Sequence, residues 1–186
     1  MSFRSLLELD ARLSDQLRVA EKPGLLRNLA AFLAHSGDSW FWGAALIILW
    51  FMSSSAWKEW AVVEFVCISG LVVLVMAIKF IVRRKRPEGE WGGIYRNTDP
   101  HSFPSGHAAR AFLIAVIASV FVPAWLVILL WVWAPLVSLA RVAMGVHYIS
   151  DILVGAIVGL VVALIGLQIH QPLLAWIANL IGFALW

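Results

Sequence analysis

Residues 61–87 read AVVEFVCISGLVVLVMAIKFIVRRKRP, an apolar run that ends abruptly in a cluster of basic residues. A helix that crosses a bilayer needs about 20 consecutive apolar residues, and residues 61–82 supply that length. Arginine and lysine gather where spanning helices reach the membrane surface. The stretch therefore predicts a transmembrane helix over 61–82 whose C-terminal end lies at one membrane face.

The composition of the whole chain agrees with a membrane protein. Its 186 residues are 62% hydrophobic and include 11 tryptophans, whereas soluble domains are about 45–50% apolar. Tryptophan concentrates at the boundary between membrane and water. The net charge is only +3, and the basic residues gather around one short region instead of forming a stripe, which argues against nucleic-acid binding. With Cys67 as its one cysteine, the chain has no internal disulfide.

Further apolar segments predict an all-α protein. We expect the other crossings at residues 40–56, 104–122, 124–144 and 147–168. Gln171-Pro172 is expected to stop the last of these helices. The run 173–186 is short, so it predicts either a strained sixth crossing or a re-entrant hairpin. The chain is thus predicted to be a single domain, residues 1–186, with a polytopic transmembrane helix bundle of five to six crossings over 40–186.

The first 38 residues are predicted to lie at the membrane surface. Residues 3–19 have leucines at helical spacing with charged residues between them, which is typical of an amphipathic interfacial helix. The apolar segment 25–35 is too short to span. The sequence Ser36-Gly37-Asp38-Ser39 breaks this segment, and Asp38 or Ser39 is expected to cap the next helix.

Three short groups of polar residues lie next to the expected helix ends. They are Lys79 with Arg86-Pro87 (79–87), Pro104-Ser105-Gly106-His107 (104–107), and Arg141 with His147 and Asp151 (141–151). Successive crossings alternate in direction, so the second and fourth crossings end on the side where the third and fifth begin. We therefore expect the three groups to converge at one membrane face. The loop over 88–103 adjoins them, and its length of about 16 residues favours a functional role.

The basic residues of these groups predict a phosphate site. Lys79, Arg86 and Arg141 are costly at the edge of a bilayer unless an anion neutralises them. The arginine fork fits phosphate oxygens, and lysine adds a compact charge. Ser105 and Gly106 add backbone N–H donors at a helix N-terminus, where the helix dipole attracts anions.

The histidines predict nucleophilic catalysis. His147 and Asp151 are four residues apart, which places both side chains on one face of a helix. An aspartate can fix the tautomer of an imidazole and leave its other nitrogen free to attack. His107 arrives from a different helix and can protonate the leaving oxygen. This arrangement predicts phosphoryl transfer through a phosphohistidine.

Together the three groups resemble the three-part signature of the type 2 phosphatidic acid phosphatase superfamily, which is related to vanadium haloperoxidases and bacterial acid phosphatases. The resemblance implies a metal-independent enzyme without a cofactor. It implies that His147 is the nucleophile, Asp151 orients it and His107 is the acid. The residues that it implies bind phosphate are Lys79, Arg86, Ser105, Gly106 and Arg141. One residue departs from the pattern, because Ala140 stands where such proteins often carry a serine.

The predicted function is hydrolysis of the terminal phosphate of a lipid phosphate or diphosphate. By resemblance the substrates are polyprenyl diphosphates such as undecaprenyl diphosphate, phosphatidylglycerophosphate, phosphatidic acid or lipid A. Alternatives are a lipid phosphotransferase, a haloperoxidase, a lipid-phosphate binding or transport protein without turnover, and a zinc site of His101, His107 and His147. The surplus of positive charge also suggests that Arg110 or Arg83 contacts a second phosphate.

The sequence gives two opposed indications of sidedness. The basic residues on the site face would put that face in the cytoplasm by the positive-inside rule. The resemblance instead implies a bacterial inner-membrane protein with the site facing the periplasm or the exterior, and we adopt that expectation. The oligomeric state is left open.

Overall fold

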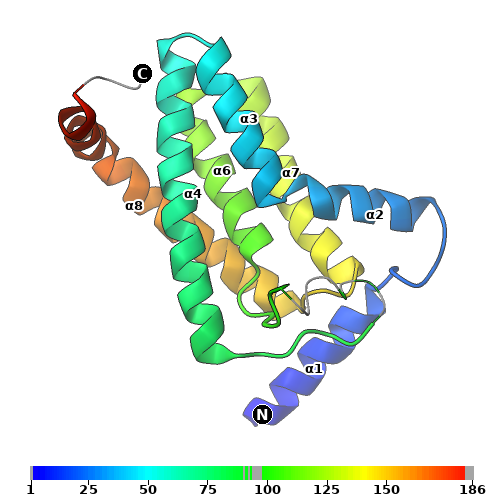
Figure 1. The fold of residues 1–186 in the computed structure, drawn as a ribbon. Coiled ribbons are helices and arrows are strands. Elements are labelled where there is room, and N and C mark those ends of the chain that lie inside the picture. The colour runs from blue at the N-terminus through cyan, green and yellow to red at the C-terminus, as the bar shows by residue number, and fades with distance from the viewer. Residues whose placement is uncertain (1, 90, 92, 94–97, 183–186) are drawn as a thin grey trace.

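The computed structural model describes residues 2–89, 91, 93 and 98–182 (Figure 1). Within these residues the chain is helical, and the only β-type pairing there is the isolated bridge between Lys85 and His101. The helices are α1 (Phe3–Gln16), α2 (Leu25–Ser36), α3 (Ser39–Met52), α4 (Ser55–Val82), α6 (Gly106–Phe121), α7 (Ala124–Ala143) and α8 (Ile149–Ile181). The predicted all-α class is confirmed.

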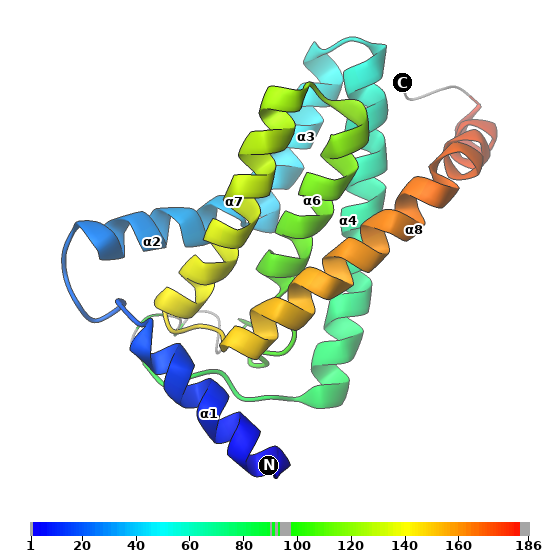
Figure 2. The ribbon, with the colours of Figure 1, turned by 180° about the vertical axis from the view of Figure 1, so that it is seen from behind.

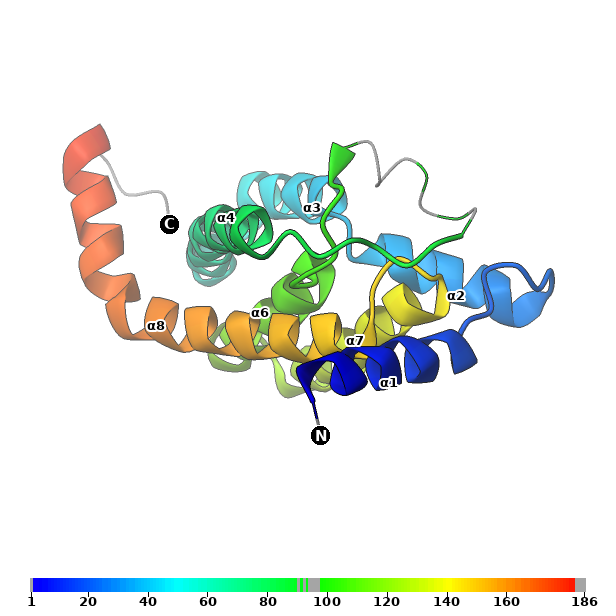
Figure 3. The same ribbon diagram turned by 90° about the horizontal axis from the view of Figure 1, so that it is seen from below.

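The helices form a bundle with two outlying N-terminal elements (Figures 1 and 2). α3, α4, α6 and α7 run side by side, and α8 crosses the bundle obliquely. α2 lies across the bundle and packs on α7, while α1 lies at the end of the bundle where α8 begins. Figure 3, which looks along the bundle, shows α6 enclosed by α4, α7 and α8.

Among the described residues, three helices are long and apolar enough to cross a membrane: α4, α7 and α8. α3 and α6 are apolar but shorter, with 14 and 16 residues. Their observed bounds are close to the expected crossings 40–56 and 104–122, although α3 ends earlier, at Met52. The protein is therefore an integral membrane protein with at least three helices of spanning length.

The expected stop at Gln171-Pro172 is wrong. α8 continues through Pro172 to Ile181 as one helix, and its C-terminal part turns away from the direction of its first part (Figure 3). A proline removes one backbone hydrogen bond and bends a helix, but spanning helices tolerate it. Within the described residues the run from 173 is thus an extension of α8 and not a separate sixth helix or hairpin.

Close contact between α6 and α8 depends on two glycines. A Cβ atom at Gly155 would come within 2.5 Å of the Ser105 carbonyl oxygen, and one at Gly159 would overlap the carbonyl group of Ala109. Small residues spaced by four let helix backbones approach closely in membranes. This contact fixes the start of α6 against the first turns of α8.

The N-terminal helix α1 is tied to the start of α8. The Ser150 amide and hydroxyl donate to the Asp10 carboxylate, and the Ile149 amide donates to Ser14 Oγ at 3.0 Å. The leucines of the apolar face remain largely exposed, at 39–48% of their surface: Leu6, Leu7, Leu9, Leu13 and Leu17. The helix thus docks through polar residues and leaves an apolar surface open, as a helix at a membrane surface would.

Candidate active site

Four helix ends meet at one end of the bundle, as the alternating directions predict. The C-terminal ends of α4 and α7 lie there with the N-terminal ends of α6 and α8 (Figure 1). A cavity of about 240 Å³ lies between them. The predicted site residues that line it are Lys79, Arg86, Gly106, His107, Arg141 and His147.

Asp151 lies next to the Nδ1 atom of His147. His147 lies between α7 and α8 with 2% of its surface exposed, and its Nδ1 is 3.5 Å from Asp151 Oδ2. Asp151 is fully buried, and the same oxygen accepts a hydrogen bond from the Tyr148 amide at 2.9 Å. Gly145, with φ of +66°, permits the turn that leads from α7 into this segment.

The hydrogen bonds of His147 define its tautomer. Arg86 Nη1 lies 3.2 Å from His147 Nε2. Arginine can only donate, so Nε2 carries a lone pair and the proton is on Nδ1, facing Asp151. Burial lowers the pKa of His147 to about 3; Asp151 opposes this shift, and the charges of Arg86 and Arg141 add to it. The imidazole is therefore neutral near pH 7, with its unprotonated nitrogen at the cavity.

Lys79 and Arg86 hold a carboxylate in this structure. Asp99, from the loop between α4 and α6, lies 2.9 Å from Lys79 Nζ and 2.8 Å from Arg86 Nη2 through the same oxygen. Both cations are buried, whereas the Asp99 side chain is 31% exposed. A carboxylate and a phosphate offer the same kind of oxygen acceptors. Asp99 therefore occupies the side of the two cations that a phosphate would need.

Ser105 and Gly106 differ in position. The Ser105 amide donates to the Asp151 carbonyl oxygen at 3.0 Å, and Ser105 Oγ accepts from the Ala108 amide at the start of α6. Its backbone donor, expected to face an anion, is thus already used within the fold. Gly106 lines the cavity directly.

Arg141 and Ala140 face different neighbours at the end of α7. Arg141 is fully buried and lines the cavity. Ala140 belongs to an apolar cluster that includes Ala30 and Ala34 of α2. A serine at position 140 would direct its hydroxyl toward α2, which explains how an alanine fits there.

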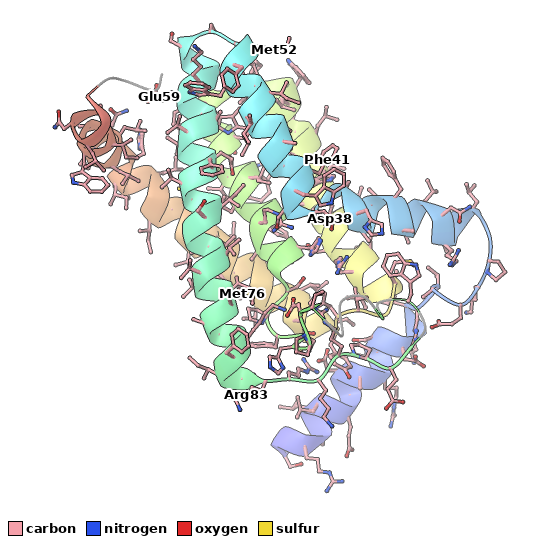
Figure 4. The ribbon with its side chains drawn as sticks, in the orientation of Figure 1. Asp38, Phe41, Met52, Glu59, Met76 and Arg83 are labelled. Carbon is pink, nitrogen blue, oxygen red and sulfur yellow. The ribbon has the colours of Figure 1, made fainter. Side chains whose placement is uncertain are left out.

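His107 has a carboxylate partner far away in sequence. Its Nε2 lies 2.7 Å from Asp38 Oδ1, at the junction of α2 and α3 that Figure 4 labels. The other oxygen of Asp38 is 3.0 Å from His35 Nδ1. Burial acts to raise the pKa of Asp38, but hydrogen bonds from His107 and His35 outweigh it and hold that pKa below its usual range.

Sequence reasoning missed three acidic side chains and one basic one. Asp38, Asp99 and Asp10 each contact a residue many positions away, and no spacing in the sequence indicates these pairings. Arg84 lies in a run of four basic residues, yet it donates to Asp151 Oδ1 and to Asp10 Oδ2, both at 2.7 Å. The sequence shows Arg84 only as one of four adjacent basic residues, and nothing in it distinguishes Arg84 from its neighbours.

The two arginines suggested for a second phosphate differ in position: Arg110 lines the cavity and Arg83 does not. The Arg110 guanidinium donates to the Gly37 carbonyl oxygen and, at 2.7 Å, to Ser39 Oγ. Arg83 has a left-handed backbone with φ of 52° at the end of α4, and its Nε donates to the Phe80 carbonyl oxygen. A contact between Arg110 and a second phosphate therefore stays a prediction.

The histidines do not form a three-residue metal site. The His101 ring packs edge-on against Phe80, with ring centroids 5.8 Å apart, while its carbonyl oxygen accepts from Lys79. Among the residues that the structure describes, no group of three or more His, Cys, Asp or Glu side chains is placed to hold a metal ion.

The sequence matches a family model, described as the PAP2 superfamily, over residues 58–174. That range contains the cavity residues from α4 to α8. The chain belongs to the PAP2 superfamily. The match leaves out α1, α2 and α3, so Asp38 lies outside it.

Several lipid phosphatases, by their names, are similar to this chain. It is 28% identical to a probable lipid phosphate phosphatase beta of Arabidopsis thaliana, covering 88% of this chain and 89% of that protein. It is 30% identical to an undecaprenyl-diphosphatase of Sulfolobus acidocaldarius, over 78% and 71%. The crystal structure of LpxE from Aquifex aeolicus superposes with a TM-score of 0.68 at 28% identity, over 86% and 95%.

Proposed function

We propose that this protein is a metal-independent phosphatase that removes the terminal phosphate of a membrane lipid through a phosphohistidine. The observation that carries the proposal is the orientation of His147. Its unprotonated Nε2 faces a cavity lined by Lys79, Arg86 and Arg141. Such cations neutralise a phosphate and stabilise the charge of its transition state.

In the first step, His147 Nε2 attacks the phosphorus atom. The bond between phosphorus and the lipid oxygen breaks, and its electron pair leaves with that oxygen. Protonated His107 gives its proton to the same oxygen, so the lipid departs as an alcohol, or as a lipid phosphate when the substrate is a diphosphate. Asp151 stabilises the positive charge that develops on the imidazole of His147.

In the second step, water replaces the lipid. The water attacks the phosphorus of the phosphohistidine, and one of its protons passes to His107, which is neutral after the first step. The bond between phosphorus and His147 Nε2 breaks, inorganic phosphate forms, and both histidines return to their starting states.

An apolar groove supports a lipid as the substrate. The cavity of the site has an apolar wall on α4 that includes Leu71, Val75 and Met76. It shares Ser39 and Val72 with a second hollow of about 330 Å³ between α3 and α4.

This second hollow continues into a third one. It shares Leu46 and Phe65 with an apolar hollow of about 430 Å³ that extends to Ala61. From Met76 to Ala61 the groove follows about 22 Å of α4 at the helical rise. An acyl or prenyl chain can lie there while its phosphate reaches His147.

The terminal phosphate is placed at Lys79, Arg86 and Arg141. Arg83 does not line the cavity, and its Nε is hydrogen-bonded to the Phe80 carbonyl oxygen, so it adds no contact to a second phosphate. The names of the relatives, which include an undecaprenyl-diphosphatase and a lipid phosphate phosphatase, agree with either type of substrate.

The proposal includes a location and a topology. We take α3, α4, α6, α7 and α8 as five crossings of one domain, with α1 and α2 at the membrane surface. The site then faces the periplasm or exterior of a bacterial inner membrane. Labelling of single cysteines introduced at exposed positions of α1, in intact cells, tests the sidedness.

Phosphate release by detergent-purified protein tests the function. The substrates are a panel of lipid monophosphates and diphosphates with EDTA present, and the variant is His147→Ala. We expect release from the native protein and at least a 10³-fold loss in the variant, because the nucleophile is removed. Release that needs a metal, or that survives in the variant, would contradict the proposal.

The same assay separates the alternatives. Transfer to a second lipid without free phosphate would identify a phosphotransferase. Saturable lipid binding without turnover would favour the binding or transport alternative, which needs the cations but not the tautomer of His147.

A further inference from the structure

We infer that Asp38 is a positioning residue for catalysis, which orients His107 and favours the protonated form that the first chemical step consumes. The inference rests on the proposed function, since it assigns a partner to its general acid. Asp38 lies outside the three sequence groups and outside the residues that the family model matches.

The first observation is the contact itself. Asp38 Oδ1 and His107 Nε2 are 2.7 Å apart, and both side chains are only 15% exposed. Charge-assisted hydrogen bonds of this length, shielded from water, are strong. With Nε2 committed to Asp38, the proton to be transferred is the one on Nδ1.

The second observation is that Asp38 does not act as a helix cap. It occupies the N-cap position of α3, where an aspartate normally accepts hydrogen bonds from the first turn of its helix, yet its side chain makes no capping bond. Its two oxygens instead contact His107 and His35. The most common role of an aspartate at this position is therefore absent, and the contact with His107 takes its place.

The third observation is that other residues hold the segment around Asp38 in place. Arg110, one helical turn after His107, donates to the Gly37 carbonyl oxygen and to Ser39 Oγ. Arg110 thereby fastens the residues on both sides of Asp38 to the helix that carries His107. The backbone of Gly37 lies so close to His107 that a Cβ there would approach its ring to 3.2 Å.

The charge balance explains why a carboxylate is needed. Arg110 and Arg141 line the same cavity as His107, so a positive imidazole there has two cationic neighbours. Asp38 supplies a compensating negative charge to His107. After the proton leaves Nδ1, the neutral ring keeps its Nε2–H bond to Asp38 and stays oriented to accept a proton from water in the second step.

A comparison of leaving groups tests this role. A lipid phosphate releases an alkoxide, which needs a proton, whereas p-nitrophenyl phosphate releases a stable phenolate, which does not. We expect Asp38→Asn to lower kcat/KM about 100-fold on the lipid phosphate, within the range of general-acid effects, and less than about threefold on p-nitrophenyl phosphate. His107→Gln should show the same pattern, and His147→Ala should abolish both activities.

Two further variants protect the test from an effect on folding. Asp38→Ser removes the carboxylate but keeps a residue that caps helices well, and it should repeat the pattern of Asp38→Asn. Asp15→Asn changes an exposed aspartate of the N-terminal helix and should leave both activities unchanged. Retained p-nitrophenyl phosphate activity shows that each variant is folded.

Equal losses on both substrates, or no loss on the lipid phosphate, would overturn the role of Asp38. If the native protein hydrolyses neither substrate, the proposed function itself fails, and the assignment of Asp38 fails with it. If His147→Ala is inactive while Asp38→Asn behaves like the native protein, the proposed function stands and only the inference is wrong.

Discussion

Two histidine–aspartate pairs lie at the same end of the bundle, and they are built differently. His147 and Asp151 are four residues apart, at the start of one helix, with Nδ1 and Oδ2 3.5 Å apart. His107 and Asp38 are 69 residues apart and come from α6 and the junction of α2 and α3, with a closer contact of 2.7 Å. The first pair is set by local helix geometry, and the second depends on the packing of three helices.

The difference also concerns which ring nitrogen each aspartate engages. Asp151 faces Nδ1 of its histidine, and the proposed mechanism uses Nε2 as the nucleophile. Asp38 faces Nε2, and the proposed mechanism uses Nδ1 as the proton donor. The same two side chains, joined through opposite nitrogens, can thus serve opposite roles in proton transfer.

The largest effect should come from breaking the local pair with Asp151→Asn. The amide can donate to Nδ1, which favours the tautomer with a proton on Nε2, and that nitrogen cannot attack. We expect kcat to fall about 10³–10⁴-fold, as for an aspartate that orients a catalytic histidine. The loss should be similar for lipid phosphate and p-nitrophenyl phosphate, in contrast to Asp38→Asn.

The control for this variant is Asp10→Asn. Asp10 contacts Arg84 and Ser150 beside Asp151 but not His147, so its loss should change kcat less than about fivefold, because the tautomer of His147 is kept. An effect of Asp10→Asn as large as that of Asp151→Asn would mean that the network, and not the tautomer, limits the reaction.

A smaller effect is expected from disturbing the close contact between α6 and α8, the helices that carry His107 and Asp151. In Gly159→Ala the new Cβ would overlap the carbonyl group of Ala109, so α6 must move away from α8. Overpacking of this kind costs about 1–3 kcal/mol. We expect a lower melting temperature in detergent and partial loss of activity on both substrates.

Gly70→Ala in α4 is the matched control, because a Cβ there has no atom from beyond its own helical turn within 4 Å. Its melting temperature should be unchanged or higher, since alanine favours a helix by about 1 kcal/mol over glycine. If both variants melt like the native protein, close packing of α6 on α8 does not hold the two pairs in register.

The smallest effect should come from Asp99→Asn. The Asp99 carboxylate forms ion pairs with Lys79 and Arg86, so a substrate phosphate that binds these cations must displace it. Removing the charge should lower KM for lipid phosphate about five- to tenfold, equivalent to about 1 kcal/mol, with kcat nearly unchanged. Steady-state kinetics over a range of lipid phosphate concentrations measures KM and kcat. A raised KM would mean that Asp99 assists substrate binding instead.

Most of the arrangement of the predicted site residues was readable from the sequence. The apolar run 61–82 predicted α4, and alternating crossings predicted that Lys79, His107 and His147 converge, as they do in one cavity. These predictions succeeded because a helix fixes the positions of residues close in sequence. Their catalytic and binding roles remain predictions until they are assayed.

The failures arose where tertiary contacts decide the outcome. Asp38 or Ser39 was expected to cap α3. Asp38 does occupy the N-cap position, but its carboxylate contacts His107 of α6 and makes no capping bond. Pro172 was read as a helix end, but the helix continues through it. Arg84 was taken as one of a group of membrane-surface cations, and only the fold shows which cation of the group reaches Asp151.

The hydrogen bonds from Arg110 to Gly37 and Ser39 have an evolutionary consequence. Position 110 lies inside the region shared by the family, whereas positions 37–39 lie before it. Substitutions at these two places should be inherited together, because an arginine without the turn, or the turn without the arginine, leaves Asp38 unsupported. Joint variation of positions 38 and 110 would then mark a lineage within the PAP2 superfamily that the three shared motifs cannot separate.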